Sequence, residues 1–526
     1  TTCAHGVGSY CLEDGSGEET FACDPLQGLT CLPEGCQGAC TPQHLGNNHV
    51  GCDFWPTVTA NSVWSQWFPF GVMVVNTTKE PATVVVTRGE TEVLTTHIEP
   101  AGMDVIELPW IEALKGADAD NDGSVFAPKK SVLSKVSGGG GAYRLRSNQP
   151  VVVTQFSTPT ASNPQGVYSG CPLNADSGEC LSYSNDASLL MPGAALGSTY
   201  SLMGWHAWKK DASQSNSRDI GDFVSITATQ DNTTVTLKPV GTTLPLEGVS
   251  INAGEETDFY LGQGDVLQLF TDPAMPSAQW AGSTVTSNHP IQVLTGAPCV
   301  NVPDRIVTCD HIEESNLPVE MLGNHYLVTA PLGPNGKSRH ILRIHGIKDE
   351  TLVEFDPSSV HSAITVNQGE VVELDLQAEG EETHDYVVSS NRVFGVTQYM
   401  VGHRAEPYSP DLPNADYGDP SQTLVIPTSR YLKRYMFALP PGFEHHRVDV
   451  IAATGAEVML DEQVVDPSSF TAIGASGLSV ARLENPEPGV RHELRSEKAF
   501  GLQVSGFGKF TSYSVPGGID LRPSNQ

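Results

Sequence analysis

Short runs in which apolar and polar residues alternate recur along the chain after residue 52. Three are pairs joined by a polar turn, namely FVSITATQDNTTVTL from Phe223, ILRIHGIKDETLVEF from Ile341 and RVDVIAATGAEVML from Arg447. Alternation of Val, Ile and Thr with polar residues, interrupted by Asp-Asn or Gly, is typical of two antiparallel strands joined in a hairpin. The pattern therefore predicts a chain built mainly from β-hairpins.

A second pattern closes each repeat of the chain. Its four copies are LRSNQPVVVTQF from Leu145, VTSNHPIQVLTG from Val285, VVSSNRVFGVTQY from Val387 and LRSEKAFGLQVSGF from Leu494. In each copy a strand ends at Ser, a short polar turn follows and a second strand begins. The copies lie roughly 100 to 140 residues apart, a distance that predicts repeated structural units of domain size.

Three of these units open with the same spacing, a Pro followed eight residues later by a Tyr: Pro192 to Tyr200, Pro318 to Tyr326 and Pro427 to Tyr435. We therefore divide the chain into four modules, residues 53–160, 184–298, 316–402 and 423–515. The first module lacks the Pro-to-Tyr opening.

Seven or so short strands in about 100 residues favour a β-sandwich for each module, because alternation leaves one apolar face that a second sheet must cover. The alternative is a β-propeller-like arrangement of the repeats. A propeller blade usually takes about 40 to 50 residues and four strands, so each module would then form two blades. We predict an all-β fold of four tandem β-sandwich-like modules.

Composition excludes several classes of protein. The 526 residues include 51 Gly and 37 Pro, and only 17% are charged, which excludes an all-helical fold. Asp and Glu total 61 against 29 Lys and Arg, so the formal charge of -32 repels nucleic acid and anionic lipid. No run reaches the 18 or so apolar residues of a membrane span, and the start shows no signal peptide, so we expect an exported, already processed chain.

Eleven cysteines support an oxidising, extracellular location. Seven fall in residues 1–52, a segment with few large apolar residues: Cys3, Cys11, Cys23, Cys31, Cys36, Cys40 and Cys52. No CxxC pair suggests zinc, so we expect disulfides of unknown pairing. Cys171 with Cys180, and Cys299 with Cys309, bracket short loops and predict two local disulfides. The odd cysteine is free, joined to another chain, or paired differently.

The strongest candidate for an ion site is Asp118-Ala-Asp120-Asn121-Asp122-Gly123-Ser124. Carboxylates at alternate positions before a Gly can surround calcium with oxygens, and the Ser124 carbonyl adds another. Lys129 stands where a bidentate Glu would complete an EF-hand loop, and no helical pattern flanks the segment. The segment is either a calcium loop with ligands Asp118, Asp120, Asp122 and Ser124, or a polar loop tip.

A second candidate site is acidic. Asp310, His311, Glu313 and Glu314 follow the loop closed by Cys299 and Cys309. Acidic side chains beside a histidine could bind a metal or a basic partner, or they form an exposed linker between modules. Aromatic residues also cluster at 55–70 and 205–208, either on loops that contact a partner or buried beneath neighbouring loops.

Catalytic motifs are absent from the sequence. There is no GxSxG elbow, His492-Glu493 has Ser496 where HExxH requires a second His, and the glycines of GPNGKS at Gly333 are too close for a phosphate loop. We therefore expect a protein that is not an enzyme.

Four longer phrases resemble a known family. They are GCDFWPTVTAN at Gly51, SNDASLLMP at Ser184, CVNVPDRIVTCDHIEE at Cys299 and GDPS at Gly418, and they occur in the family's order. Together they resemble the N-terminal domain family named after the IgG Fc-binding protein, whose vertebrate member is secreted and associated with mucins. The resemblance covers residues 51–515 and extends to bacterial surface and secreted proteins.

The resemblance implies a non-enzymatic, extracellular binding or structural module, named for affinity to the Fc part of IgG. The Cys-rich start and the Asp-rich insert look like additions of bacterial members, which favours adhesion, matrix or fibre assembly. We expect a secreted or cell-surface protein whose loops contact a protein or glycan partner, including further copies of itself. The alternative is a calcium-stabilised carbohydrate-active enzyme or accessory domain, which requires two carboxylates about 5 to 9.5 Å apart in a cleft.

Overall fold

The protein is built almost entirely from antiparallel strands. The computed structural model describes residues 2–4, 7–11, 18–46, 48–120, 125–162, 171–174, 178–211, 213, 218–334, 336, 339–376, 385–405 and 414–522. Within these residues the α-helices are α1 (Pro42–Leu45) and α2 (Glu112–Lys115). No helix in these ranges has the length and apolarity to cross a bilayer. The predicted all-β fold is confirmed.

In modules 1, 3 and 4, two sets of antiparallel strands share one long strand, whereas module 2 has two separate sheets. In module 3 this strand is β27 (Tyr386–Met400). Its first half pairs with β22 (Gly323–Val328) and β24 (Thr351–Asp356), and β25 (Ile364–Val366) forms the edge beyond β24. Its second half pairs with β23 (His340–Gly346) and β28 (Ser421–Leu424), and β26 (Val371–Leu376) forms the edge beyond β23. In modules 1, 3 and 4 the closing pattern of the sequence is therefore one strand that belongs to both sets of strands.

Modules 1 and 4 repeat this arrangement, and module 2 divides the long strand into two. The strand that follows each long strand pairs with it, so residues 187–189, which the predicted bounds place in module 2, belong to the sheet of module 1. Module 1 has β6 (Gly51–Phe54), β7 (Phe70–Asn76), β8 (Ala82–Arg88), β9 (Thr91–Ile98), β10 (Met103–Leu108), β12 (Arg144–Phe156) and β13 (Ala187–Leu189). Module 2 has β14 (Thr199–Ser201), β15 (Phe223–Ala228), β16 (Thr233–Lys238), β17 (Thr257–Leu261), β18 (Val266–Phe270), β19 (Thr284–Ser287), β20 (Ile291–Val300) and β21 (Asp310–Ser315), extended by β11 (Val132–Ser134). Module 4 has β29 (Leu432–Ala438), β30 (His445–Ala453), β31 (Met459–Leu460), β32 (Gln463–Val464), β33 (Phe470–Ala472), β34 (Leu478–Glu484), β35 (Arg491–Gly508) and β36 (Thr511–Pro516).

The repeated Pro-to-Tyr spacing has a structural cause. Each Pro caps a short 3-10 turn, and the Tyr then packs into its module core. In module 3 the Tyr326 hydroxyl accepts a hydrogen bond from Gly323 N at 2.9 Å and donates one to Phe394 O at 2.6 Å. Tyr200 and Tyr435 make the equivalent pair of bonds. The Tyr therefore ties the opening of its module to the closing strand.

We expect Tyr326→Phe to lower the free energy of unfolding by about 1 to 3 kcal/mol, because the buried Gly323 N–H loses its acceptor. The measurement is equilibrium unfolding in urea. Tyr260→Phe is the matched control, since Tyr260 is 74% exposed and should tolerate the change. Equal stability of the two variants would contradict this role for the hydroxyl.

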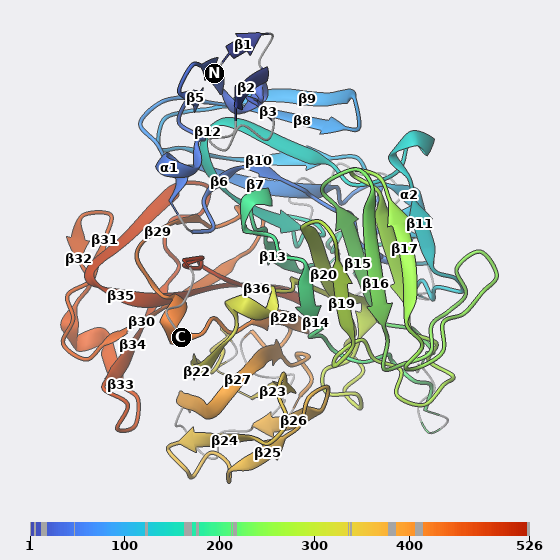
Figure 1. Ribbon diagram of the computed structural model, residues 1–526. Helices are drawn as coiled ribbons and strands as arrows, with labels where there is room; N and C mark the ends of the chain where they lie inside the picture. Colours follow the sequence, from blue (N-terminus) through green and yellow to red (C-terminus); the bar gives the residue numbers. More distant parts are fainter. Residues whose placement is uncertain are drawn as a thin grey trace.

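The four modules surround a common centre (Figure 1). Strands β13, β21, β28 and β36, here called the axis strands, follow the four long strands in sequence and form the inner edges of the four modules. β21 contacts β13 and β28, and β36 contacts the same two strands, so the axis strands form a closed ring. The modules are thus sandwiches individually and are arranged around an axis collectively.

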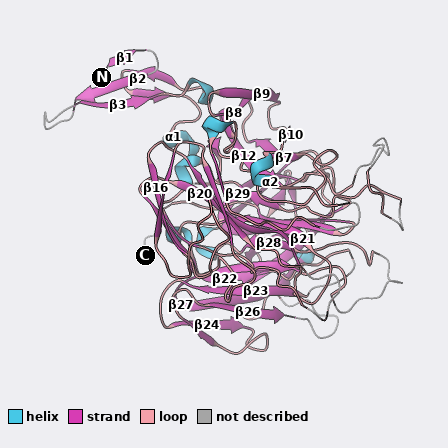
Figure 2. Cartoon of the chain, turned by 90° about the vertical axis from the view of Figure 1, so that its right-hand side faces the viewer, coloured by secondary structure: helices cyan, strands magenta, loops and turns pink. Residues whose placement is uncertain are grey.

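The Cys-rich segment stands apart from this ring (Figure 2). It contains β1 (Thr2–Ala4), β2 (Val7–Cys11), β3 (Glu18–Ala22), β4 (Thr30–Leu32) and β5 (Gly35–Gln37). Disulfides join Cys23 to Cys36 and Cys40 to Cys52. Arg146 on β12 lies 3.2 Å from Asp24 and holds the segment against module 1.

Candidate functional site

Strand edges meet at the buried centre of the molecule, where their backbone N–H and C=O groups need hydrogen-bond partners from the protein. An axis strand pairs with its own long strand on one side only, so some of its backbone N–H groups point toward the neighbouring modules. A buried N–H group without an acceptor is costly. The sequence supplies these acceptors as acidic side chains.

Asp186 is the most highly bonded of these acids. It is fully buried just ahead of β13. One carboxylate oxygen accepts hydrogen bonds from Glu313 N on β21 and Gln422 N on β28, both at 3.0 Å. The other accepts from Ala187 N and from Ser421 Oγ, each at 2.9 Å. One side chain therefore joins three of the four axis strands.

Two further carboxylates extend these links. Glu314 accepts a hydrogen bond from Leu424 N at 3.3 Å, which joins β21 to β28. Asp310 accepts from Thr511 Oγ1 at 2.7 Å, which joins β21 to β36. Asp419, ahead of β28, lies 3.1 Å from His403 Nδ1.

Burial controls the titration of this group. It raises the pKa of Asp186 well above the ordinary value, although the four hydrogen-bond donors act in the opposite direction. Burial, together with the charge of nearby Asp419, raises the pKa of Asp310. Burial also raises the pKa of Glu314. Within the described residues no Lys or Arg forms an ion pair with these three acids.

The expectation of an exposed acidic linker is wrong. Asp310, His311, Glu313 and Glu314 lie on β21, where the exposed fraction of each residue is at most 1%. Glu313 accepts from Gln155 Nε2 at 3.0 Å and lies 3.5 Å from His311 Nε2. These acids are therefore inaccessible to a partner in the folded protein, and they hold modules together.

Four loops gather at one end of the axis. They connect each long strand to the axis strand that follows it, and their described residues are 157–162, 171–174, 178–186, 301–309, 401–405, 414–420 and 509–510. The Tyr183 and Phe510 rings lie 5.7 Å apart, and the His403 and Phe510 rings 5.0 Å apart, so three of the loops touch one another. We call this end of the molecule the loop face.

A pocket of about 460 Å³ opens on the loop face. Cys299 and Cys309 both line it, which brings the remaining loop into the same site. The pocket is lined by Ser62, Trp64, Ala119, Val125, Pro172, Leu173, Ser182, Tyr183, Ser184, Cys299 and Cys309. Disulfides join Cys171 to Cys180 and Cys299 to Cys309 at its edge. We call it the loop-face pocket.

Two of the aromatic residues here have unusual backbones. Tyr183 has a φ of 53° and Phe510 a φ of 56°. Bulky side chains rarely adopt this left-handed region, and such strain is concentrated at functional sites. The Trp64 ring meets Tyr183 edge-on at 6.2 Å, and Trp64 Nε1 donates to Ala119 O at 2.9 Å. The pocket therefore has fixed aromatic walls.

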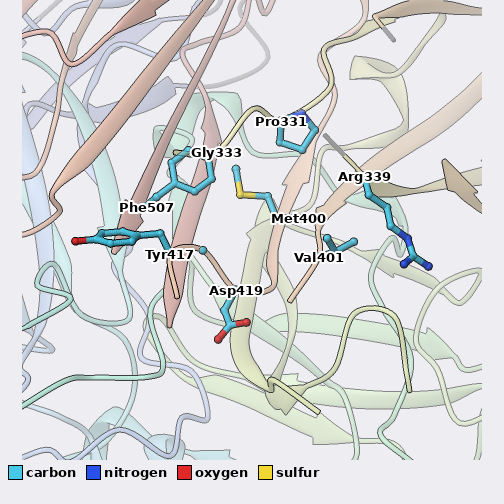
Figure 3. A pocket seen from close by; sticks show the side chains of 9 residues that line it. Pro331, Gly333, Arg339, Met400, Val401, Tyr417, Asp419 and Phe507 are labelled. Carbon is cyan, nitrogen blue, oxygen red and sulfur yellow. The ribbon is translucent and has the colours of Figure 1, made fainter. Parts of the chain in front are cut away.

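A smaller pocket lies between modules 3 and 4 (Figure 3). It is lined by Pro331, Gly333, Arg339, Met400, Val401, Tyr417, Gly418, Asp419 and Phe507. Its volume of about 30 Å³ corresponds to roughly one water molecule, which is too small for a ligand. The loop-face pocket is the better candidate for a binding site.

The calcium loop stays a prediction. Asp118 lies 2.5 Å from Lys115 Nζ and accepts hydrogen bonds from Ser65, while Asp120 is exposed. Asp122 and Ser124 lie outside the described residues. Among the residues that are described, no group of three or more His, Cys, Asp or Glu could hold a metal ion. Cys31 is also disulfide-bonded, and the side chains of Cys3 and Cys11 lie outside the described part.

Comparison with known proteins identifies the family. The model of the IgGFc binding protein family matches residues 186–506, which is more than half of the chain. The chain belongs to this family. The matched region begins at Asp186, the acid that joins three axis strands, and it contains β21, β28 and all of module 3.

A curated relative in this family is the IgGFc-binding protein of Homo sapiens, which is 24% identical over 334 residues. That match spans 63% of this chain but only 6% of the human protein. Two solved anti-sigma factor domain-containing proteins, one of them from Clostridium clariflavum, are 10% and 9% identical with TM-scores of 0.11 and 0.12. They cover 62% and 61% of this chain, and 98% and 96% of their own lengths.

Proposed function

We propose that this member of the IgGFc-binding protein family is a secreted or cell-surface binding protein without enzymatic activity, which contacts a protein partner through its loop face. The observation that carries the proposal is the loop face itself. Three long connections and one short one meet there, disulfides pin those of modules 1 and 2, and these two connections line the loop-face pocket. Loops positioned by a rigid scaffold are the usual place for recognition residues.

The family supports a protein partner, because its human relative is named for binding the Fc part of IgG. The formal charge of -32 favours a basic partner surface and accelerates encounters with it. Adhesion or assembly, including assembly of this chain with itself, is the role we propose for such contacts. The disulfides are in keeping with an extracellular setting.

Catalysis finds less support. Hydrolysis of a glycosidic bond needs two carboxylates that flank an accessible bond. The described lining of the loop-face pocket contains no Asp or Glu. The central acids are buried and hold backbone N–H groups.

Cross-linking mass spectrometry of the protein in its native extracellular setting tests the proposal. Lys509 lies on the loop face beside Glu179, 2.6 Å away. We expect Lys509 to cross-link to a second polypeptide, whereas Lys348, exposed in the turn between β23 and β24, should cross-link within its own chain. Cross-links to a partner only from Lys348, or from neither lysine, would contradict a binding role for the loop face.

Binding to IgG itself is a separate measurement. The measurement is biolayer interferometry with human Fc at micromolar concentration, and Fab is the matched control. Retention of Fc but not Fab would extend the named property of the human relative to this chain. Retention of neither would assign a different protein partner to the loop face.

A further inference from the structure

The lining of the loop-face pocket favours an uncharged group. Among its described lining residues there is no Asp, Glu, Lys, Arg or His. Its volume of about 460 Å³ falls within the range of roughly 300 to 1,000 Å³ that ligand sites occupy. A buried charge without a partner would be strongly disfavoured in such a site. The group that enters should therefore be neutral.

The polar groups of the pocket are mostly committed to the protein. Ser62 Oγ accepts from Phe126 N at 3.0 Å, and Ser182 Oγ donates to Ala161 O at 3.1 Å. Ser184 Oγ is buried without a hydrogen-bond partner. A sugar presents a hydroxyl on most of its carbons, and each one taken from water needs a partner. The Ser184 hydroxyl alone cannot bond all the hydroxyls of a sugar ring, so an apolar group fits the pocket better.

The mouth of the pocket offers apolar contact. Leu173 is 61% exposed, which is high for a leucine in a segment pinned by a disulfide. Opposite are the fixed rings of Trp64 and Tyr183. Rigid aromatic walls need little ordering when a guest binds, which increases affinity.

Acidic side chains flank the lining of the pocket in the chain. Asp118 and Asp120, both exposed, stand on either side of Ala119, and Glu179 precedes Cys180. Lys115 pairs with Asp118 and Lys509 with Glu179, so Asp120 adds a negative charge that no described Lys or Arg pairs. The chain as a whole carries a formal charge of -32. A positively charged segment is therefore attracted to this mouth.

We propose that the loop-face pocket receives an uncharged apolar side chain of a partner polypeptide, and that basic residues flank this side chain in the partner. The proposal rests on the proposed function, since it specifies the chemistry of the protein partner. An anchor residue seated in a preformed pocket is the usual source of affinity in protein interfaces. Leu173, Trp64 and Tyr183 supply the apolar contact, and the acidic excess supplies the preference for basic flanks.

The test is selection of peptides from a random twelve-residue phage library on the folded, disulfide-intact protein. We expect enriched peptides to carry Leu, Pro or an aromatic residue between Lys or Arg residues. A synthetic copy of an enriched peptide is then titrated by calorimetry. Leu173→Asp should weaken its binding by about tenfold or more, because a charge enters the apolar mouth. Leu173→Met should retain it.

Leu352→Asp is the matched control, since Leu352 is an exposed leucine on β24, 41% exposed, far from the loop face. It should bind the peptide as the wild type does. Peptides with acidic flanks, equal binding by Leu173→Asp, or no enrichment over Leu173→Asp would each overturn the pocket assignment. The proposed function fails separately, if Lys509 cross-links to no partner.

Discussion

Asp186→Ala is expected to lower the free energy of unfolding by about 3 to 5 kcal/mol. The carboxylate accepts hydrogen bonds from three backbone N–H groups and one hydroxyl, contributed by β13, β21 and β28. Alanine leaves these donors buried without an acceptor, and no water reaches them from the surface. The measurement is equilibrium unfolding in guanidinium chloride.

Asp258→Ala is the matched control for this variant. Asp258 is an exposed acid on β17 that accepts a single hydrogen bond from Thr236 Oγ1 at 2.6 Å. Its removal should change the stability by less than about 1 kcal/mol. If Asp186→Ala and Asp258→Ala lower the free energy of unfolding equally, the central hydrogen bonds do not hold the modules together.

The second large effect is a loss of stability as the pH rises above the ordinary carboxyl pKa of about 4. Burial raises the pKa of Asp186, Asp310 and Glu314 in the folded protein. An acid with a raised folded pKa contributes stability that is complete below its ordinary pKa and is lost as the pH rises through the folded pKa. Between its ordinary pKa and its folded pKa, each such group lowers the free energy of unfolding by about 1.4 kcal/mol per pH unit.

Histidines act in the opposite direction, but at lower pH. Burial lowers the pKa of His49, His206 and His446 to about 4, from an ordinary value of 6.5. Their effect is an increase in stability with pH that ends near 6.5. The contribution of one acid is therefore isolated by comparing the wild type, at each pH, with a variant that lacks the acid.

Unfolding of the wild type and of Asp310→Asn between about pH 4 and about pH 9 is the measurement. We expect the free energy of unfolding of the wild type, relative to that of Asp310→Asn, to fall as the pH rises, because the amide does not titrate. Asp258→Asn should follow the wild type. A difference between the wild type and Asp310→Asn that is constant or rises with pH would contradict the raised pKa of Asp310.

The repeated modules could be predicted from the sequence because their signals are local. Alternation over six to eight residues predicts a strand, and the copies of the closing pattern around Leu145 and Leu494 show where each unit ends. The Pro-to-Tyr spacing predicted a common opening for three modules. The cause of this spacing is the hydrogen bond that the Tyr326 hydroxyl donates to Phe394 O. This bond exists only in the folded module, so the sequence could not predict it.

The ring of axis strands could not be predicted, since its contacts join residues far apart in the chain. Asp186 and Ser421 are 235 residues apart, and nothing in either segment identifies the other. From the sequence, the run from Asp310 to Glu314 is interpreted as a site or a linker, because charged residues are usually exposed. They are buried because strand edges that meet at an axis need acceptors. A run of acids inside an otherwise strand-like segment is the signal that could have indicated this.

The pocket was only partly foreseeable. The bracketing cysteines at 171 and 180, and at 299 and 309, predict two loops that are held by disulfides. The pattern of the aromatic cluster that includes Trp64 fits exposed and buried positions equally. That these loops share one pocket follows from the closure of the ring, which brings the connections of modules 1 and 2 to the same end of the axis.

Amide hydrogen exchange tests the central claim most directly, namely that buried carboxylates link the inner edges of the modules and accept hydrogen bonds from backbone N–H groups there. In the native protein we expect the N–H groups of Glu313, Gln422 and Leu424 to exchange as slowly as those in the sheet ladders. Asp186→Ala should accelerate exchange at Glu313 and Gln422 together, although they belong to different modules. Exchange at these positions as fast as on the exposed edge strand β17 would contradict the account.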